Sequence, residues 1–227
     1  MPRAWRSRAA WFTLLFTRAI GLAADLYSKH WAFQSVAGRP VTVLREDVLA
    51  IAAVDPRAIG RGIIPPHEPV VVIPHVLNFT LVLNPGAVFG MGAGQRWFFI
   101  TFTAVAMTVG LLVFARATRA GDRWTHIALG LLLAGGVGNV YDRLFYSCVR
   151  DFIHPLPGVR FPFGWSPFGS NGEVWPYVSN VADALLIVGI GMLFLRLMRA
   201  DHAHDVQAGH AAPDAKPAPA PEGRPAP

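Results

Sequence analysis

The chain has 227 residues, of which 53% are hydrophobic and 15% are charged, and its mean hydropathy is +0.38. A soluble domain of this length is usually less apolar, so the composition points to a membrane protein. The net charge of +6 comes without a basic stripe or a nucleic-acid-binding motif, so we expect no nucleic-acid partner. The single cysteine, Cys148, excludes an internal disulfide framework and a zinc site built on several cysteines.

Four apolar stretches are long enough to cross about 30 Å of hydrocarbon as helices. They cover approximately residues 11–33, 97–115, 125–141 and 178–197. The sequence therefore predicts an all-α membrane protein with four transmembrane helices. The N-terminus also has features of a cleavable signal peptide, but Arg18 interrupts its apolar run, which then continues past residue 24. We expect this first helix to be retained.

Arginines cluster in the short segments that flank these stretches. They are Arg3, Arg6, Arg8, Arg116, Arg119, Arg123, Arg196 and Arg199. An even number of spans puts both termini on one side, and the positive-inside rule makes that side the cytoplasm. We expect one transmembrane domain over residues 1–200 and a disordered cytoplasmic tail over 201–227, which is too rich in Ala and Pro to form a core.

Two long loops, 34–96 and 142–177, then lie outside the cytoplasm. Residues 69–84 are rich in β-branched side chains and are interrupted by Pro74, which predicts a small extracytoplasmic β element of short strands. Residues 37–68 contain turn signals without a clear period, and we expect an irregular insertion there.

Ionisable side chains at membrane depth are costly unless they are paired or hydrated, so each is a candidate functional group. Asp25 and Lys29 stand four residues apart on the first predicted helix, in the order that favours an ion pair. We favour an ion pair that anchors this helix over a chemical role, although the pair can still border a site.

Asn139, Asp142 and Arg143 follow one another at helical spacing near the end of the third predicted span. A guanidinium stabilises a buried carboxylate, which then makes a poor proton donor. We therefore interpret these three residues as a hydrogen-bonded lock between helix and loop, with catalysis as the less favoured alternative.

Asp151 lies in "VRDFI", and Asp183 lies in "SNVAD", one helical turn after Asn180. The predicted topology puts both aspartates at the same depth on the outer side. Two carboxylates that share a pocket of low dielectric do not both ionise, so one keeps its proton while the other acts as a base. Aspartic proteases activate water in this way. From spacing alone, two unrelated helix-end carboxylates explain the pattern equally well.

The segment "LNPGAVFGMGAG", residues 83–94, is a loop by its Pro and Gly content. It is either a simple connection to the second span or a wall that holds a substrate. The second outer loop is rich in aromatic side chains, which we expect to form a belt at the membrane interface. They are Phe161, Phe163, Trp165, Phe168, Trp175 and Tyr177.

Taken together and in this order, the motifs resemble those of lipoprotein signal peptidase, or signal peptidase II, a family of aspartyl intramembrane proteases of bacteria. "NPGAVFG" is similar to the family's N-x-G-A-A-F and "GGVGNVYDRL" to its G-x-x-G-N-x-x-D-R. "VRDFI" is similar to its V-x-D-F, and "SNVAD" to its F-N-x-A-D. The similarity runs from about residue 11 to residue 196.

The resemblance implies an endopeptidase of the bacterial inner membrane that removes the signal peptide from prolipoproteins, cutting before the cysteine that carries diacylglycerol. It implies that Asp151 and Asp183 are catalytic and that the active site lies near the outer face. The residues that it implies in support of the site are Asp25, Lys29, Asn84, Gly86, Asn139, Asp142, Arg143 and Asn180. We expect no metal or cofactor, membrane lipids as partners, and a monomer.

The chain departs from the family's pattern at several positions, which bear on substrate preference and turnover. They are Pro85, Val88, Ser147, Ser179 and Ala184. The rival hypothesis is a membrane carrier or lipoprotein-binding protein without catalysis, which would use the same carboxylates as a relay.

Overall fold

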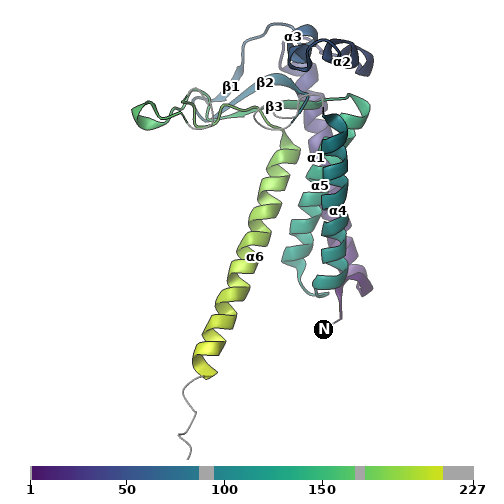
Figure 1. Cartoon of the computed structure of the whole chain (residues 1–227), viewed down its shortest axis with the longest axis vertical. Coiled ribbons are helices and arrows are strands. Elements are labelled where there is room, and N and C mark those ends of the chain that lie inside the picture. The colour runs from purple at the N-terminus through teal and green to yellow at the C-terminus, as the bar shows by residue number, and fades with distance from the viewer. Residues whose placement is uncertain (1, 87–94, 167–171, 212–227) are drawn as a thin grey trace, which may run out of the picture.

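The computed structural model describes residues 2–86, 95–166 and 172–211. Four long helices form a bundle, and a small sheet with two short helices covers one end of it (Figure 1). The elements in chain order are η1 Ala4–Arg6, α1 Arg8–Ser35, α2 Arg45–Ala52, η2 Pro56–Ala58, α3 Ile59–Ile63, β1 Val70–Ile73, β2 Leu77–Asn84, α4 Arg96–Ala117, α5 Arg123–Phe145, β3 Val149–Pro155, η4 Pro162–Gly164 and α6 Val181–Ala211.

Each of the four predicted spans is a helix. Among the described residues, 3 helical stretches could cross a membrane by length and composition, namely α1, α4 and the part of α6 that ends at Arg199. The remaining helix, α5, carries the polar group Asn139, Asp142 and Arg143 and contacts α1, α4 and α6. The mostly helical membrane fold with a small sheet is therefore confirmed, while the crossing by α5 stays a prediction.

Small residues bring α5 close to its neighbours. A Cβ at Gly135 would lie 2.4 Å from the carbonyl oxygen of Ala182 in α6, and one at Gly130 would lie 2.9 Å from that of Leu14 in α1. Helices in lipid associate by such close packing, because no hydrophobic force drives them together there. The contact at Gly135 fixes the start of α6 against the middle of α5, and the contact at Gly130 fixes α1 against α5.

The N-terminus and the C-terminal end of α6 lie at the end of the bundle opposite the sheet (Figure 1). The first residues fold back on the turn between α4 and α5, where the Ala4 amide donates to the Thr118 carbonyl at 3.0 Å. The α6 helix continues to Ala211, into the segment predicted as a tail. Residues 212–227 lie outside the described residues.

The sheet has the order β1-β2-β3, and both strand pairs are antiparallel. The predicted strands are present on either side of Pro74, whereas β3 was not predicted. The β2–β3 register passes from Phe79↔Ile153 to Val82↔Asp151, so β2 has one extra residue at this point and forms a β-bulge.

The prediction of an irregular insertion at 37–68 is wrong, because this segment contains α2 and α3. Its Val48 and Ile59 are buried and pack in one core with Leu83 of β2 and Phe152 of β3. The insertion thus supports the face of the sheet from which Leu83 and Phe152 project.

Candidate active site

The β2–β3 pair brings Asn84 and Asp151 together. Val82 stands opposite Asp151, and Asn84 stands two residues further along β2 on the same face. Asn84 Nδ2 donates to Asp151 Oδ2 at 3.1 Å. Asn84 Oδ1 accepts from the Gly86 amide at 3.0 Å, which fixes the orientation of the asparagine amide.

Asp183 lies in the first turn of α6 and forms a reciprocal cap with Asn180. The Asp183 amide donates to Asn180 Oδ1 at 3.1 Å, and the Asn180 amide donates to Asp183 Oδ2 at 3.2 Å. This exchange is the capping-box arrangement, which satisfies backbone donors at a helix start. The motif "SNVAD" therefore begins the helix and also positions its aspartate.

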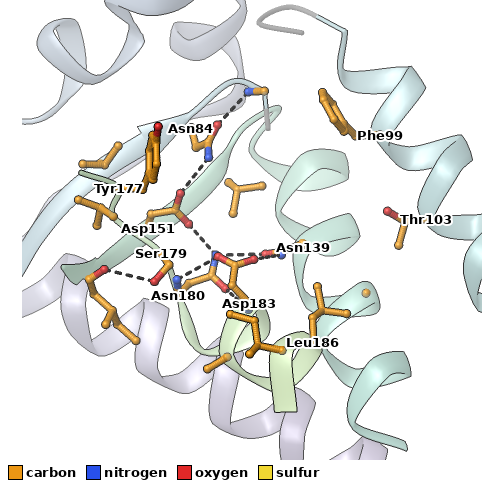
Figure 2. Close-up of a pocket in the computed structure, with 18 of the residues that line it drawn as sticks. Asn84, Phe99, Thr103, Asn139, Asp151, Tyr177, Ser179, Asn180, Asp183 and Leu186 are labelled. Carbon is orange, nitrogen blue, oxygen red and sulfur yellow. Dashed lines mark hydrogen bonds between the residues drawn. The ribbon is translucent and has the colours of Figure 1, made fainter. Parts of the chain in front are cut away.

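Two asparagines link the aspartates into one network (Figure 2). Asn180 Nδ2 donates to Asp151 Oδ1 at 2.6 Å and to Asn139 Oδ1 at 3.2 Å. Asn139 Nδ2 donates to Asp183 Oδ1 at 2.8 Å, while its oxygen also accepts from Lys29 Nζ at 3.2 Å. The structure thus places the two predicted carboxylates on either side of Asn180, whose side-chain amide donates to Asp151 and whose backbone amide donates to Asp183.

A fully buried ion cluster lies behind this network. Lys29 Nζ is 2.9 Å from Asp25 Oδ2 and 3.4 Å from Asp142 Oδ2. Arg150 Nη2 is 2.8 Å from Asp142 Oδ1. Asp25 Oδ1 accepts from the Ala182 amide at 2.9 Å, so this cluster also holds the first turn of α6. Two cations and two carboxylates balance, as buried charges require.

The arginine that pairs with Asp142 is Arg150, whereas the predicted lock used the adjacent Arg143. Consecutive residues on a helix point in different directions, and β3 returns past the end of α5 to supply the closer guanidinium. Arg143 instead donates to the Gly86 carbonyl at 2.9 Å and lies 5.1 Å from the ring centre of Phe99.

Burial changes the acidity of Asp151. Desolvation, followed in size by the negative charge of Asp183, raises its pKa from 3.8 to about 7. The hydrogen bonds from Asn180 and Asn84 act in the opposite direction. Near neutral pH the site therefore contains a carboxyl group that can either hold or release a proton.

An apolar groove of about 1620 Å³ extends from the carboxyl pair along α4, α5 and α6. Figure 2 shows Phe99 and Thr103 of α4 across the pocket from Asp151. Further apolar lining residues are Phe102, Met107, Leu132, Leu133, Ile187 and Ile190. The groove can therefore accommodate long hydrocarbon groups next to the acidic pair.

Aromatic residues of the loop 142–177 border the same groove. Phe161, Trp165, Trp175 and Tyr177 line it, and Phe163 is fully exposed. Their role as an interfacial belt stays a prediction. The predicted belt residue Phe168 and residues 87–94, which include Val88, lie outside the described residues.

Sequence reasoning missed the roles of Arg150 and Ser147. Ser147 has a φ of 64°, in the left-handed region that glycine adopts most readily, and its hydroxyl accepts a hydrogen bond from Arg96. This turn reverses the chain between α5 and β3 and so brings Arg150 back to Asp142. The sequence signal for Arg150 is its position directly before Asp151 in the short segment "VRDFI".

Among the described residues, no group of three or more His, Cys, Asp or Glu side chains is arranged to hold a metal ion. The expectation that the protein uses no metal or cofactor stays a prediction.

The model of the signal peptidase II family matches residues 17–199. A lipoprotein signal peptidase of Desulfitobacterium hafniense is 34% identical over 135 residues, which cover 59% of this chain and 77% of that protein. One from Symbiobacterium thermophilum is 34% identical over 155 residues, covering 66% of this chain and 92% of that protein.

A bacterial membrane enzyme solved by the in meso method at 1.9 Å resolution has a similar fold. Its TM-score is 0.55 at 21% sequence identity, and the match covers 82% of this chain and 92% of that chain. The family model covers most of the chain and includes every residue of the hydrogen-bonded network around Asp151 and Asp183. The chain therefore belongs to the signal peptidase II family of aspartic peptidases.

Proposed function

We propose that this protein is a lipoprotein signal peptidase, an aspartic endopeptidase that removes the signal peptide from lipoprotein precursors in the membrane. Family membership supports this activity. The observation that carries it is the network in which Asn180 joins Asp151 to the helix start that contains Asp183.

The two aspartates share one proton near neutral pH. The ionised carboxylate takes a proton from a water molecule, whose oxygen attacks the scissile carbonyl carbon while the protonated carboxyl donates to the carbonyl oxygen. The proton taken from water then passes to the leaving nitrogen as the carbon–nitrogen bond breaks. The raised pKa of Asp151, about 7, suits a group that changes protonation state during this cycle.

The other predicted residues hold this pair in place. Asparagine donors orient the carboxylates, Arg143 ties the loop after β2 to α5, and the buried ion cluster fixes the first turn of α6. The supporting residues are Asp25, Lys29, Asn84, Gly86, Asn139, Asp142, Arg143 and Asn180.

The groove suits a substrate whose cysteine carries diacylglycerol, because its apolar walls begin beside the carboxyl pair. We infer that cleavage occurs before that cysteine, near the outer face of the bacterial inner membrane. In this arrangement α5 is the fourth crossing, residues 1–200 form a monomeric peptidase domain, and both termini, including the tail 201–227, are cytoplasmic. The outer loops are 34–96 and 142–177.

A non-catalytic carrier or lipoprotein-binding protein is the weaker alternative. The family is one of peptidases, and both aspartates retain their asparagine donors. A carrier would tolerate any change that preserves polarity at these positions, whereas a peptidase would not.

The test replaces each aspartate by asparagine and measures cleavage of a diacylglyceryl-modified precursor peptide by the purified protein. Asp151→Asn and Asp183→Asn should each slow cleavage by roughly a thousandfold, because neither amide can exchange the required proton. Asp122→Asn is the matched control, since Asp122 lies at the opposite end of α5. Its side chain accepts from the Thr125 amide at 3.3 Å, a cap that asparagine can keep, and lies 3.4 Å from a half-exposed Arg196. Wild-type rates in either dyad variant would refute the proposal.

A further inference from the structure

We infer that His67 is a positioning residue of the proposed peptidase, because its imidazole holds the β2 bulge that turns Asn84 toward Asp151. The inference rests on the proposed function for its effect on cleavage. The hydrogen bonds that carry it are independent of that function.

The hydrogen bonds of His67 specify one protonation state of its ring. Nδ1 lies 3.0 Å from the Pro65 carbonyl oxygen, which only accepts, so Nδ1 carries the proton. Nε2 then has a free lone pair and accepts from the Leu81 backbone amide at 3.1 Å. The Thr80 hydroxyl oxygen lies 3.4 Å from the same nitrogen. Both nitrogens of a neutral imidazole are therefore used.

The Leu81 amide needs this acceptor because it lies in the bulge. On the β3 side of β2, the pairing skips from Phe79↔Ile153 to Val82↔Asp151. On the β1 side, the pairing ends at Phe79, so neither neighbouring strand is paired with Leu81. Leu81 is only 5% exposed, so water does not readily replace a lost partner. A buried amide without an acceptor is costly, and His67 removes that cost.

The bulge decides which face of the sheet Asn84 occupies. With the bulge present, Asn84 projects toward Asp151, while Leu83 packs into the core against the insertion. Without the bulge, the residues of β2 that follow it would be displaced by one position relative to β3. Each of their side chains would then point to the opposite face of the sheet. Leu83 would then point into the groove, and Asp151 would lose one of its donors.

The insertion that contains His67 also supports this stretch through apolar contacts. Val48 and Ile59 pack in the same core as Leu81 and Leu83. Polar and apolar contacts from residues 37–68 thus converge on the few residues that precede Asn84.

The experiment compares three replacements of His67 in the purified full-length protein. His67→Gln keeps an acceptor oxygen near the position of Nε2, His67→Asn keeps only a donor near Pro65, and His67→Ala keeps neither. We expect the Ala and Asn variants to lower kcat about 10-fold or more with little change in KM, and the Gln variant to stay within about threefold of wild type. His75→Asn, which removes an exposed imidazole from the β1–β2 turn, is the matched control and should behave as wild type.

Hydrogen exchange of a peptide that contains Leu81 provides a readout independent of cleavage. Exchange should accelerate in the Ala and Asn variants and remain slow in the Gln variant. If the Ala variant does not accumulate, the Asn and Gln variants give the same contrast. A Gln variant as slow as Asn, or Ala and Asn variants with wild-type kcat, would overturn the inference. If the wild-type protein itself does not cleave, the proposed function fails, and the exchange measurement alone decides whether His67 holds the bulge.

Discussion

Neutral amides hold both carboxylates of the site. Asn84 and Asn180 donate to Asp151, and Asn139 donates to Asp183. A neutral donor lowers the pKa of a carboxyl group less than a cation would, so burial and the charge of Asp183 still raise the pKa of Asp151. An arginine in the place of Asn84 or Asn180 would lower the pKa of Asp151 and so work against the proton that the proposed mechanism requires.

The raised pKa of Asp151 predicts an alkaline limit to activity. Burial and the charge of Asp183 raise this pKa from 3.8 to about 7, so the group keeps its proton below that pH and loses it above. Cleavage that requires one protonated carboxyl should therefore decline as the pH rises through about 7. The measurement is kcat/KM over a pH range that extends about two units on either side of 7.

Asn84→Leu provides the matched test of this pH limit. Asn84 lowers the pKa of Asp151 through its hydrogen bond, so its removal should move the alkaline limb to higher pH while also reducing the maximal rate. If the alkaline limb of the pH profile stays in place or moves to lower pH in this variant, the limb does not report the pKa of Asp151.

The sequence predicts Asp151 and Asp183 as the catalytic pair, whereas it does not predict the contacts of these two side chains. The order of the four motifs singles out Asp151 and Asp183 within a resembling family. Their approach depends on the bulged β2–β3 register and on the cap at Asn180, and neither follows from residue spacing. The partner of Asp142 was predicted wrongly for the same reason, because helical spacing describes only neighbours along the chain.

At the scale of elements, the contact between α5 and α6 determines where Asp183 lies. A Cβ at Gly135 would meet the Ala182 carbonyl oxygen at 2.4 Å, so Gly135→Val should push the start of α6 away from α5. Cleavage should fall about 100-fold, since small displacements of catalytic groups have effects of this size, and the thermal midpoint in detergent should also fall. The assay is cleavage of the precursor peptide together with a thermal unfolding scan.

Gly191→Val is the control for this change, because a Cβ at Gly191 would meet no atom of the described residues within 4 Å. It introduces the same β-branched residue into α6 itself. Equal losses of activity in the two variants would show that helix propensity, and not the α5–α6 contact, is responsible.

The long helices were predictable because a membrane span needs a long apolar run, which is visible without tertiary context. The strand β3 was missed because its first residues, Val149 to Phe152, are all buried, so no alternation of polar and apolar side chains reveals it. The helices α2 and α3 have only 8 and 5 residues, which is too short for a helical period to be visible in the sequence. Helices this short are stabilised by packing, here through Val48 and Ile59.

For the whole molecule, the proposed topology can be tested by cysteine labelling without removing the native thiol. Cys148 is 1% exposed, and burial raises its pKa to about 12, so it should not react. Val54→Cys places a thiol at an 89% exposed site in the first outer loop, and Gly121→Cys places one in the exposed turn between α4 and α5. A membrane-impermeant maleimide should label Val54→Cys in intact spheroplasts and Gly121→Cys only after permeabilisation. The reverse pattern would invert the topology.

If the proposed function holds, a lipid-anchored precursor enters the groove along α4 and α6 from the membrane. A lipid-anchored precursor arrives by lateral diffusion in two dimensions, so the quantity that saturates the site is its mole fraction in the bilayer or micelle. Adding detergent at constant substrate dilutes that fraction and slows turnover, even though the bulk concentration is unchanged. Michaelis constants for this protein are therefore properties of the mixture, and two preparations agree only when substrate is expressed per mole of amphiphile.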